Sequence, residues 1–338
     1  MLAIVCPGQG SQTPGFLAPW LEVPDVAERL RWLSAVAGMD LVAHGTTSDA
    51  ETIRDTAVAQ PLIVAAGLVA LPALLPETVR DPDDVAAVAD VVAGHSVGEL
   101  TAAALAGVLT AEQALVLVRE RGRGMAAASA VTPTGMSAVL GGNPEEVAAA
   151  LEEHGLTAAN RNAAGQVVAA GTLEQLAALA AAPPARTRIV PLQVAGAFHT
   201  AHMAPAVDVL AGYARALTPQ PPRIELLSNA DGAVVESGSE ALWRIVDQVS
   251  RPVRWDACTT TLAELGVTGL LELPPAGTLA GLAKRGLPGV EIVALKTPDD
   301  LPAARALVET HAERAGGSAA PVAPTNDTGL TPASGGTA

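Results

Sequence analysis

Two short apolar segments, each followed at once by a glycine-containing loop, constrain the fold of this 338-residue chain more than any other feature. Residues 2–6 run into one such loop, and residues 88–93, interrupted only by Asp90, run into Gly94–Gly98 before an alanine-rich helix at 99–106. A strand with no polar face has to be covered on both sides, which is typical of the parallel sheets of α/β proteins. Similar strands, separated by helical stretches, are predicted at 224–227, 268–273 and 291–295.

The stretch between residues 129 and 195 has a different order of elements. Strands and helices follow each other as βαββαβ, with the helices at 144–154 and 173–181, and this order is that of a ferredoxin-like fold. We therefore predict a small domain at 129–195 that is inserted into a larger domain made of 1–128 and 196–315. The last segment, 316–338, is rich in Gly, Pro, Ser, Thr and Ala and is predicted to be a disordered tail.

Charge and composition exclude several classes of partner and site. A net charge of −15 and an aromatic content of 2% disfavour nucleic acid and anionic membranes as partners. Neither Lys284 nor Lys296, the two lysines, follows a glycine, so the chain has no G-x-x-x-x-G-K-[ST] phosphate loop. Cys6 and Cys258 form no C-x-x-C pair, which argues against structural zinc and suits a reducing compartment.

The sequence also carries no sign of secretion or membrane insertion. No charged residue precedes Glu22, whereas a secretory signal begins with a basic region. The longest apolar run, 62–75, is interrupted by Pro72 and is shorter than a membrane span. We expect a cytoplasmic protein, and a monomer, because no coiled coil or dimer face is evident.

The pattern Gly94-x-Ser96-x-Gly98, between a buried strand and a helix, has the arrangement of a nucleophile elbow. The two glycines suit a sharp turn in which neighbouring backbone comes too close for a Cβ atom. Such a turn presents the Ser96 hydroxyl at the sheet edge, beside the positive end of a helix. The competing interpretation is a glycine-rich turn in which the serine only caps the helix.

A reactive serine needs a base, and the candidates are the six histidines, His44, His95, His154, His199, His202 and His311. His199 follows a strand and stands among small residues, as expected of a base on a loop at the sheet edge. His95 is adjacent to Ser96 in sequence and is expected to serve local structure. His202 could pair with His199 on a metal, but no third ligand is evident, so no metal site is predicted.

At this point the chain resembles the malonyl-CoA:acyl carrier protein transacylases over about residues 1–300. The resemblance is carried by short motifs in the same order and spacing: 7–12 (PGQGSQ), 60–61 (QP), 94–99 (GHSVGE), 121–125 (RGRGM), 166–168 (QVV), 196–199 (GAFH), 228–229 (SN) and 248–255 (QVSRPVRW). It implies a hydrolase-like parallel-sheet large domain with an inserted ferredoxin-like small domain, in agreement with the segmentation above. One departure is Pro274-Pro275-Ala276-Gly277, where the family has Gly-Pro-Gly.

The resemblance also implies catalytic roles. Ser96 corresponds to the nucleophile and His199 to its base, while a main-chain carbonyl near Gln248 steers the imidazole in place of an acidic residue. The backbone N–H groups of Gln9 and Val97 correspond to an oxyanion hole. Glycines on both sides of Gln9 allow that loop to approach a substrate closely.

Five further residues are expected to bind the acyl group. Arg121 resembles the residue that pairs with the free carboxylate of malonate, and an arginine fork suits that task. Composition alone favours the alternative that Arg121 lies on a solvated helix face with Arg119 and Arg123. Met125 is expected to line the acyl pocket, although methionine at such a spacing is commonly plain core. Phe198 resembles the bulky residue that favours malonyl over methylmalonyl, and Asn160 and Gln166 are expected to be polar supports of the cleft.

The implied reaction moves a malonyl group from malonyl-CoA, through a malonyl-serine, to the phosphopantetheine thiol of acyl carrier protein, with no metal or redox cofactor. Alternatives are a polyketide-type acyltransferase that serves another carrier, a serine hydrolase, and a non-catalytic carrier-docking module. CoA and carrier proteins are both anionic, whereas this chain is acidic. We therefore expect a local basic rim, for which the candidates are Arg186, Arg188, Lys284 and Arg285.

Overall fold

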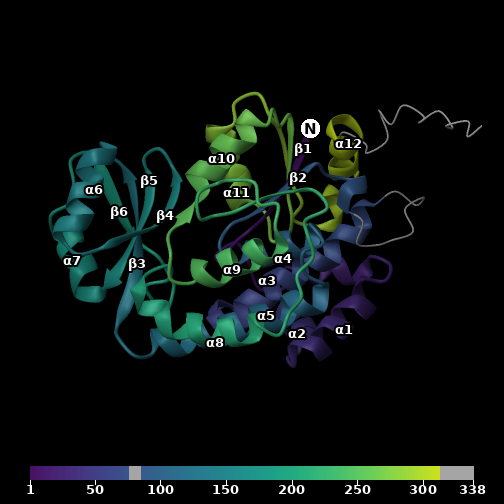
Figure 1. Ribbon diagram of the computed structural model, residues 1–338, viewed down its shortest axis with the longest axis horizontal. Coiled ribbons are helices and arrows are strands. Elements are labelled where there is room, and N and C mark those ends of the chain that lie inside the picture. Colours follow the sequence, from purple (N-terminus) through teal and green to yellow (C-terminus); the bar gives the residue numbers. More distant parts are fainter. Residues whose placement is uncertain (76–84, 313–338) are drawn as a thin grey trace, which may run out of the picture.

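The computed structural model describes residues 1–75 and 85–312, and Figure 1 shows them as two packed regions, each built around a five-stranded sheet. The larger sheet is entirely parallel and has the order β10-β9-β1-β2-β7. Its strands are β1 (Leu2–Cys6), β2 (Val91–Gly94), β7 (Glu225–Leu227), β9 (Gly269–Glu272) and β10 (Glu291–Ala294). The strand predicted at 88–93 begins only at Val91, because the N–H groups of Val88 and Ala89 donate to the carbonyl of Val85 and continue the preceding 3-10 turn.

Both faces of the parallel sheet are buried, which confirms the expectation from its apolar strands. Alternate residues of β1 belong to different core clusters, with Leu2, Ile4 and Cys6 in one and Ala3 and Val5 in the other. The second cluster also contains residues of α10 (Trp255–Glu264) and α11 (Thr278–Gly286). The first cluster includes α1 (Val26–Ala37), α3 (Thr56–Ala70), α4 (Gly98–Leu105), α5 (Ala111–Ser129), α8 (Ala204–Ala214), α9 (Gly238–Gln248) and α12 (Leu301–His311). The short α2 (Leu41–Thr46) packs on α1 and α3.

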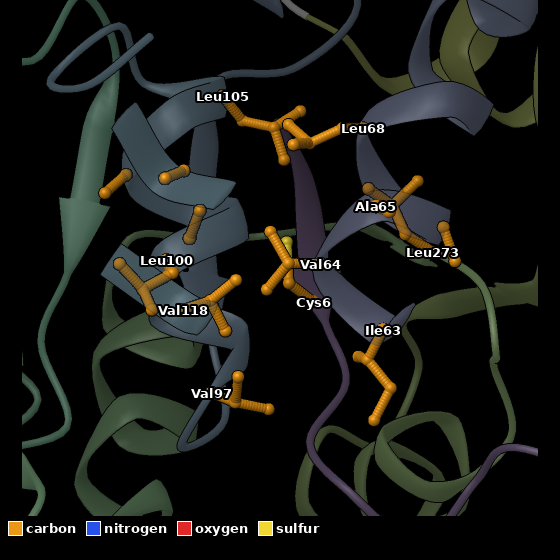
Figure 2. Packing of buried hydrophobic residues seen from close by; sticks show 14 of the residues in the cluster. Cys6, Ile63, Val64, Ala65, Leu68, Val97, Leu100, Leu105, Val118 and Leu273 are labelled. Carbon is orange, nitrogen blue, oxygen red and sulfur yellow. The ribbon is translucent and has the colours of Figure 1, made fainter. Parts of the chain in front are cut away.

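Helix α3 forms the centre of the larger core. In Figure 2, Val64 lies beside Cys6 of β1, and Leu68 lies against Leu105 of α4. Within the described residues one helical segment, Thr56–Leu74, is long and apolar enough to cross a membrane, but 78% of it is buried inside the protein. This segment is longer than the apolar run seen in the sequence, so its burial against α4 and α5, rather than its length, identifies it as a core helix.

The second sheet has the order β6-β3-β5-β4-β8. Its first four strands are antiparallel neighbours in the ferredoxin-like arrangement, covered by α6 (Pro144–Glu153) and α7 (Leu173–Ala181) over a small apolar core. Those strands are β3 (Thr134–Gly141), β4 (Thr157–Ala163), β5 (Gln166–Thr172) and β6 (Thr187–Pro191). The α/β fold class with its βαββαβ unit is therefore confirmed.

The fifth strand of this sheet was not foreseen. The two-residue β8 (Val253–Arg254) pairs in parallel with β4, with Asn160 opposite Val253, although it lies outside the predicted insert. This strand joins the two regions through backbone pairing next to residues that were expected to form the site. The domain boundaries at 129 and 195 stay a prediction, and the predicted tail at 316–338 lies outside the described residues.

Candidate active site

The glycine-flanked serine forms a strained turn between β2 and α4. Ser96 has a left-handed backbone with φ of 54°. A Cβ atom on Gly94 would overlap the backbone of Gly98, and one on Gly98 would overlap the carbonyl of Cys6. These positions therefore have room only for glycine, and the turn raises the Ser96 hydroxyl at the end of the strand, beside the first turn of α4. This geometry is that of a nucleophile elbow.

His199 meets this serine from the loop that follows the second sheet. Its Nε2 lies 2.7 Å from Ser96 Oγ, and its Nδ1 lies 2.8 Å from the main-chain oxygen of Gln248. A carbonyl only accepts hydrogen bonds, so Nδ1 carries the proton and Nε2 is free to accept one from the serine hydroxyl. Like Ser96, His199 has a left-handed backbone, with φ of 60°.

The imidazole is held in its neutral, basic form. Burial and, to a smaller extent, the charge of Arg121 lower the pKa of His199 to about 3, although the hydrogen bond to Gln248 opposes the shift. In the described part of the chain the ring bonds to Ser96 and Gln248 and to no carboxylate. A carbonyl thus takes the orienting place that an acidic residue has in a Ser-His-Asp triad.

Arg121 is a buried cation beside the serine. It is 1% exposed, and its two terminal nitrogens donate to Gln60 Oε1 at 2.7 Å and to Gln248 Oε1 at 2.8 Å. The second of these also lies 3.4 Å from Ser96 Oγ, while Nε has no partner among the described residues. Burial lowers the pKa of Arg121 to about 10 against the opposing charge of Glu99, so it stays cationic at neutral pH.

The solvated-face alternative is wrong for Arg121 and describes only Arg123, because the side chain of Arg119 is 21% exposed and that of Arg123 is 54% exposed. Arg119 pairs with Glu120 and donates to the carbonyl of Val36, and Arg123 also pairs with Glu120. Arg121, by contrast, forms no ion pair with a described carboxylate, which leaves a buried guanidinium without a direct counter-ion. Such a group is costly unless an anion binds to it.

These groups line one cavity of about 220 Å³ between the two regions. Nine of the ten expected site residues lie in its wall: Gln9, Ser96, Val97, Arg121, Met125, Asn160, Gln166, Phe198 and His199. The tenth, Gln248, reaches the site through its bonds to Arg121 and His199. Part of the apolar wall comes from the second sheet, including Met136, Ala138 and Val168.

The expected oxyanion donors are available. Neither the N–H of Gln9 nor that of Val97 donates a hydrogen bond to another described residue. The Gln9 side chain donates to the carbonyl of Arg54 at 3.1 Å, which anchors its loop. A Cβ on Gly8 would come within 3.0 Å of His95, so glycine permits the close packing of this loop.

The polar supports divide into two kinds. Asn160 is buried, and its Oδ1 has no partner among the described residues, so it is free to receive a substrate donor. Gln166 accepts a hydrogen bond from Arg285 of α11 at 2.8 Å. This bond spans the two regions at the cavity wall and brings one residue of the expected basic rim to the site.

The loop that departs from the family motif leads into a helix whose first residues line the cavity. The carboxylate of the fully buried Glu272 accepts hydrogen bonds from the N–H groups of Gly277, Leu279 and Ala280, and so holds the beginning of α11. Thr278 and Leu279 then line the cavity. The unusual 274–277 sequence is therefore compatible with a helix start that contributes Thr278 and Leu279 to the cavity wall.

The sequence did not predict the roles of two residues in this site, Gln60 and His95. Gln60 binds Arg121 and also contacts Met125 Sδ at 3.4 Å. His95 was expected to serve only local structure, but it lines the cavity and pairs with Asn162 of β4 at 2.9 Å. Gln60-Pro61 was one of the motifs of the resemblance, but its position in the sequence does not show that Gln60 binds Arg121.

His202 lies exposed on a 3-10 turn. Across residues 1–75 and 85–312 no group of three or more His, Cys, Asp or Glu side chains could hold a metal ion.

Comparisons with known proteins agree with this geometry. The acyl transferase domain family matches residues 3–306. The malonyl CoA-acyl carrier protein transacylase of Mycobacterium tuberculosis is 52% identical over 301 residues, which cover 89% of this chain and 98% of that protein. The enzyme of that name from Escherichia coli is 33% identical over 309 residues, again covering 89% and 98%.

Solved structures give the same result. The crystal structure of MCAT from Mycobacterium tuberculosis superposes with a TM-score of 0.85 at 51% identity, covering 90% of this chain and 99% of that one. A malonyl-transacylase solved in complex with a type II PKS acyl-carrier protein superposes with a TM-score of 0.82 at 31% identity, covering 90% and 99%. The chain is therefore an acyltransferase of the acyl transferase domain family and belongs, within it, to the malonyl CoA-acyl carrier protein transacylases.

Proposed function

We propose that this protein transfers a malonyl group from malonyl-CoA to the phosphopantetheine thiol of acyl carrier protein by way of a malonyl ester on Ser96. The observation that carries this proposal is the buried guanidinium of Arg121, which lies 3.4 Å from the Ser96 hydroxyl and has no carboxylate partner in the described structure. The free carboxylate of a dicarboxylic acyl group would supply that partner while the serine attacks the thioester at the other end of the group.

The first half-reaction forms the ester. His199 Nε2 takes the proton of Ser96 as its oxygen attacks the thioester carbon, and the imidazolium then protonates the departing CoA thiolate. The carbonyl of Gln248 holds Nδ1–H and stabilises the imidazolium. The N–H groups of Gln9 and Val97, which donate to no other described residue, would hold the oxyanion, and losing one such donor typically lowers turnover about 10²- to 10³-fold.

The second half-reaction returns the enzyme to its starting state. His199 takes the proton of the carrier's thiol, the thiolate attacks the malonyl ester, and the proton passes to the released Ser96 oxygen. Every proton in this scheme moves between a side chain and a substrate. We therefore propose that the reaction needs no metal or redox cofactor, with malonyl-CoA as a substrate only.

The acyl pocket selects by charge and by size. A malonyl carboxylate would supply the counter-ion that Arg121 lacks, whereas an acetyl group would leave this guanidinium buried and unpaired. Phe198, 7% exposed, lines the cavity directly before the base and limits room beside the acyl α-carbon. Met125 and the amides of Asn160 and Gln166 complete the wall.

Initial-rate kinetics tests the proposal. With malonyl-CoA and holo-carrier both varied, a covalent intermediate predicts parallel double-reciprocal lines, and no malonyl transfer in the Ser96→Ala variant. Hydrolysis of malonyl-CoA that does not depend on the carrier would instead support a serine hydrolase. The absence of any turnover would support a non-catalytic docking module.

A second carrier is the alternative that a specific observation favours. The structural relative in complex with a type II PKS acyl-carrier protein shows that a malonyl-transacylase of this fold can engage such a carrier. Competition between a fatty-acid carrier and a polyketide carrier for the malonylated enzyme would rank the two by kcat/KM.

Carrier docking is proposed to use the basic rim. Lys284 and Arg285 are exposed at the end of α11, and Arg285 reaches Gln166 at the cavity wall, whereas Arg186 and Arg188 are exposed at the start of β6. Reversing Lys284 and Arg285 to glutamate should raise the KM for carrier and reduce its salt dependence. Arg31→Glu on α1 is the matched control at a remote exposed arginine. Identical low-salt kinetics in the double variant and the control would refute this docking site.

A further inference from the structure

Glu99 is a buried carboxylate that the mechanism above does not use. It follows Gly98 in the first turn of α4 and is 3% exposed. One carboxylate oxygen accepts the N–H of Asn229 at 2.6 Å, and the other accepts the side-chain amide of Gln248. A buried polar network whose members are hydrogen-bonded in this way rigidifies the structure around it.

The contacts of the Gln248 amide fix its orientation. Its Nε2 faces three acceptors, namely Glu99, the Ser96 carbonyl at 3.0 Å and Asn229 Oδ1 at 3.1 Å. Its Oε1 faces Arg121, which donates to it at 2.8 Å. The reversed amide would set NH₂ against the guanidinium and oxygen against three acceptors, so this environment selects one orientation.

Gln248 thereby serves two functional groups at once. Its side-chain oxygen accepts from Arg121, and its main-chain oxygen accepts from His199 Nδ1. Asn229 connects the same network to the elbow, because its Oδ1 accepts the N–H of Ser96 at 2.8 Å and its Nδ2 donates to the carbonyl of Gly94 at 2.7 Å. Glu99 accepts hydrogen bonds from both Gln248 and Asn229. It is therefore connected through them to the base His199, the cation Arg121 and the turn that carries Ser96.

We propose that Glu99 is a positioning residue, which in its ionised form holds Gln248 and Asn229 so that Arg121, His199 and the Ser96 turn stay in register. This inference rests on the proposed function. It assigns to Glu99 no contact with the substrate, only the alignment of three groups that do contact it.

The electrostatic surroundings make this network sensitive to pH. The charged and titratable groups facing Glu99 are Arg121 of α5, Arg244 of α9 and Cys258 of α10, while β7 presents apolar side chains. Burial raises the pKa of Glu99 to about 7, against the opposing effects of the Asn229 N–H, Arg121 and the Gln248 amide. Above about pH 7 Glu99 is ionised and accepts at both oxygens. Below that pH the carboxyl group is protonated, and the oxygen that carries the proton is a weaker acceptor for the Asn229 N–H or the Gln248 amide.

The predicted consequence is a fall in malonyl transfer as pH is lowered through about 7. His199 does not explain such a fall, because its pKa is lowered to about 3 and it stays neutral in that range. We therefore assign the fall in rate at acid pH to protonation of Glu99.

The test compares Glu99→Gln, which keeps shape and removes charge, with Glu120→Gln. Glu120 is a largely buried carboxylate on α5 that pairs with Arg119 and Arg123 and makes no bond to the site. At pH 8 we expect Glu99→Gln to lower kcat/KM for malonyl-CoA roughly tenfold to hundredfold, the effect of losing one charge-assisted hydrogen bond. KM should rise because Arg121 is less well positioned, and kcat should fall because His199 is less well positioned. The fall in rate near pH 7 should disappear. Glu120→Gln should keep this fall.

Each outcome has a distinct meaning. A wild-type protein that transfers no malonyl group refutes the proposed function. A wild-type protein that transfers malonyl without an acid limb between about pH 6 and 8 overturns the role of Glu99, even if the Gln variant fails to fold. An unchanged limb in folded Glu99→Gln also overturns it, whereas loss of the limb in that variant alone supports it.

Discussion

Replacing Arg121 with alanine probes the specificity of the cavity most sharply. The guanidinium is 1% exposed, its Nε is unbonded within the described residues, and its terminal nitrogens reach only amide oxygens and Ser96. A malonyl carboxylate there would gain about two charge-assisted hydrogen bonds, each contributing about 1.5–3 kcal/mol. The sum of about 3–6 kcal/mol corresponds to a loss of roughly 10²- to 10⁴-fold in kcat/KM for malonyl-CoA.

The same substitution should act in the opposite direction on a neutral acyl group. Acetylation from acetyl-CoA leaves the cation unpaired in the wild type, so Arg121→Ala should leave its rate unchanged or raise it. Stopped-flow measurement of CoA release with both substrates gives the ratio. Arg119→Ala, on the same helix but paired with Glu120, is the control and should alter neither rate. Equal losses for malonyl and acetyl in Arg121→Ala would refute a carboxylate-binding role.

Three further predictions follow from residues around the site. Phe198→Ser should raise the ratio of methylmalonyl to malonyl transfer about tenfold or more, since excluding one methyl is worth about 1–3 kcal/mol, and an unchanged ratio in a competition assay would count against the steric role. Gly98→Ala places a Cβ in the carbonyl of Cys6, so we expect loss of soluble protein or a marked drop in Tm, and a wild-type Tm would disprove the packing argument. Burial raises the pKa of the Cys6 and Cys258 thiols, so a thiol reagent at pH 8 should label them only after denaturation, whereas rapid labelling of the native protein would show that they are accessible.

Local sequence patterns predicted the elements of the fold because each pattern has a local cause. The helix predicted at 173–181 coincides with α7, which is opened by a reciprocal capping box of Thr172 and Gln175. The apolar run 2–6 became a strand buried on both faces. In each case the residues that decide the structure lie within one element.

What could not be predicted depends on contacts between distant elements. The β8–β4 pairing involves two residues of a loop, which carry no strand pattern of their own. The partners of Arg121 lie on α3 and α9, and no spacing along the chain brings Gln60 and Gln248 to one guanidinium. The network around Glu99 was missed for the same reason, since a Glu in a first helical turn is ordinarily explained by the helix dipole.

The central claim of this account is that Ser96 becomes a malonyl ester, and intact-protein and peptide mass spectrometry after brief mixing with malonyl-CoA tests it directly. We predict one malonyl adduct on the peptide that contains Ser96, which disappears when holo-carrier is added and never forms in Ser96→Ala. No adduct, or an adduct on another residue that persists in Ser96→Ala, would contradict the account.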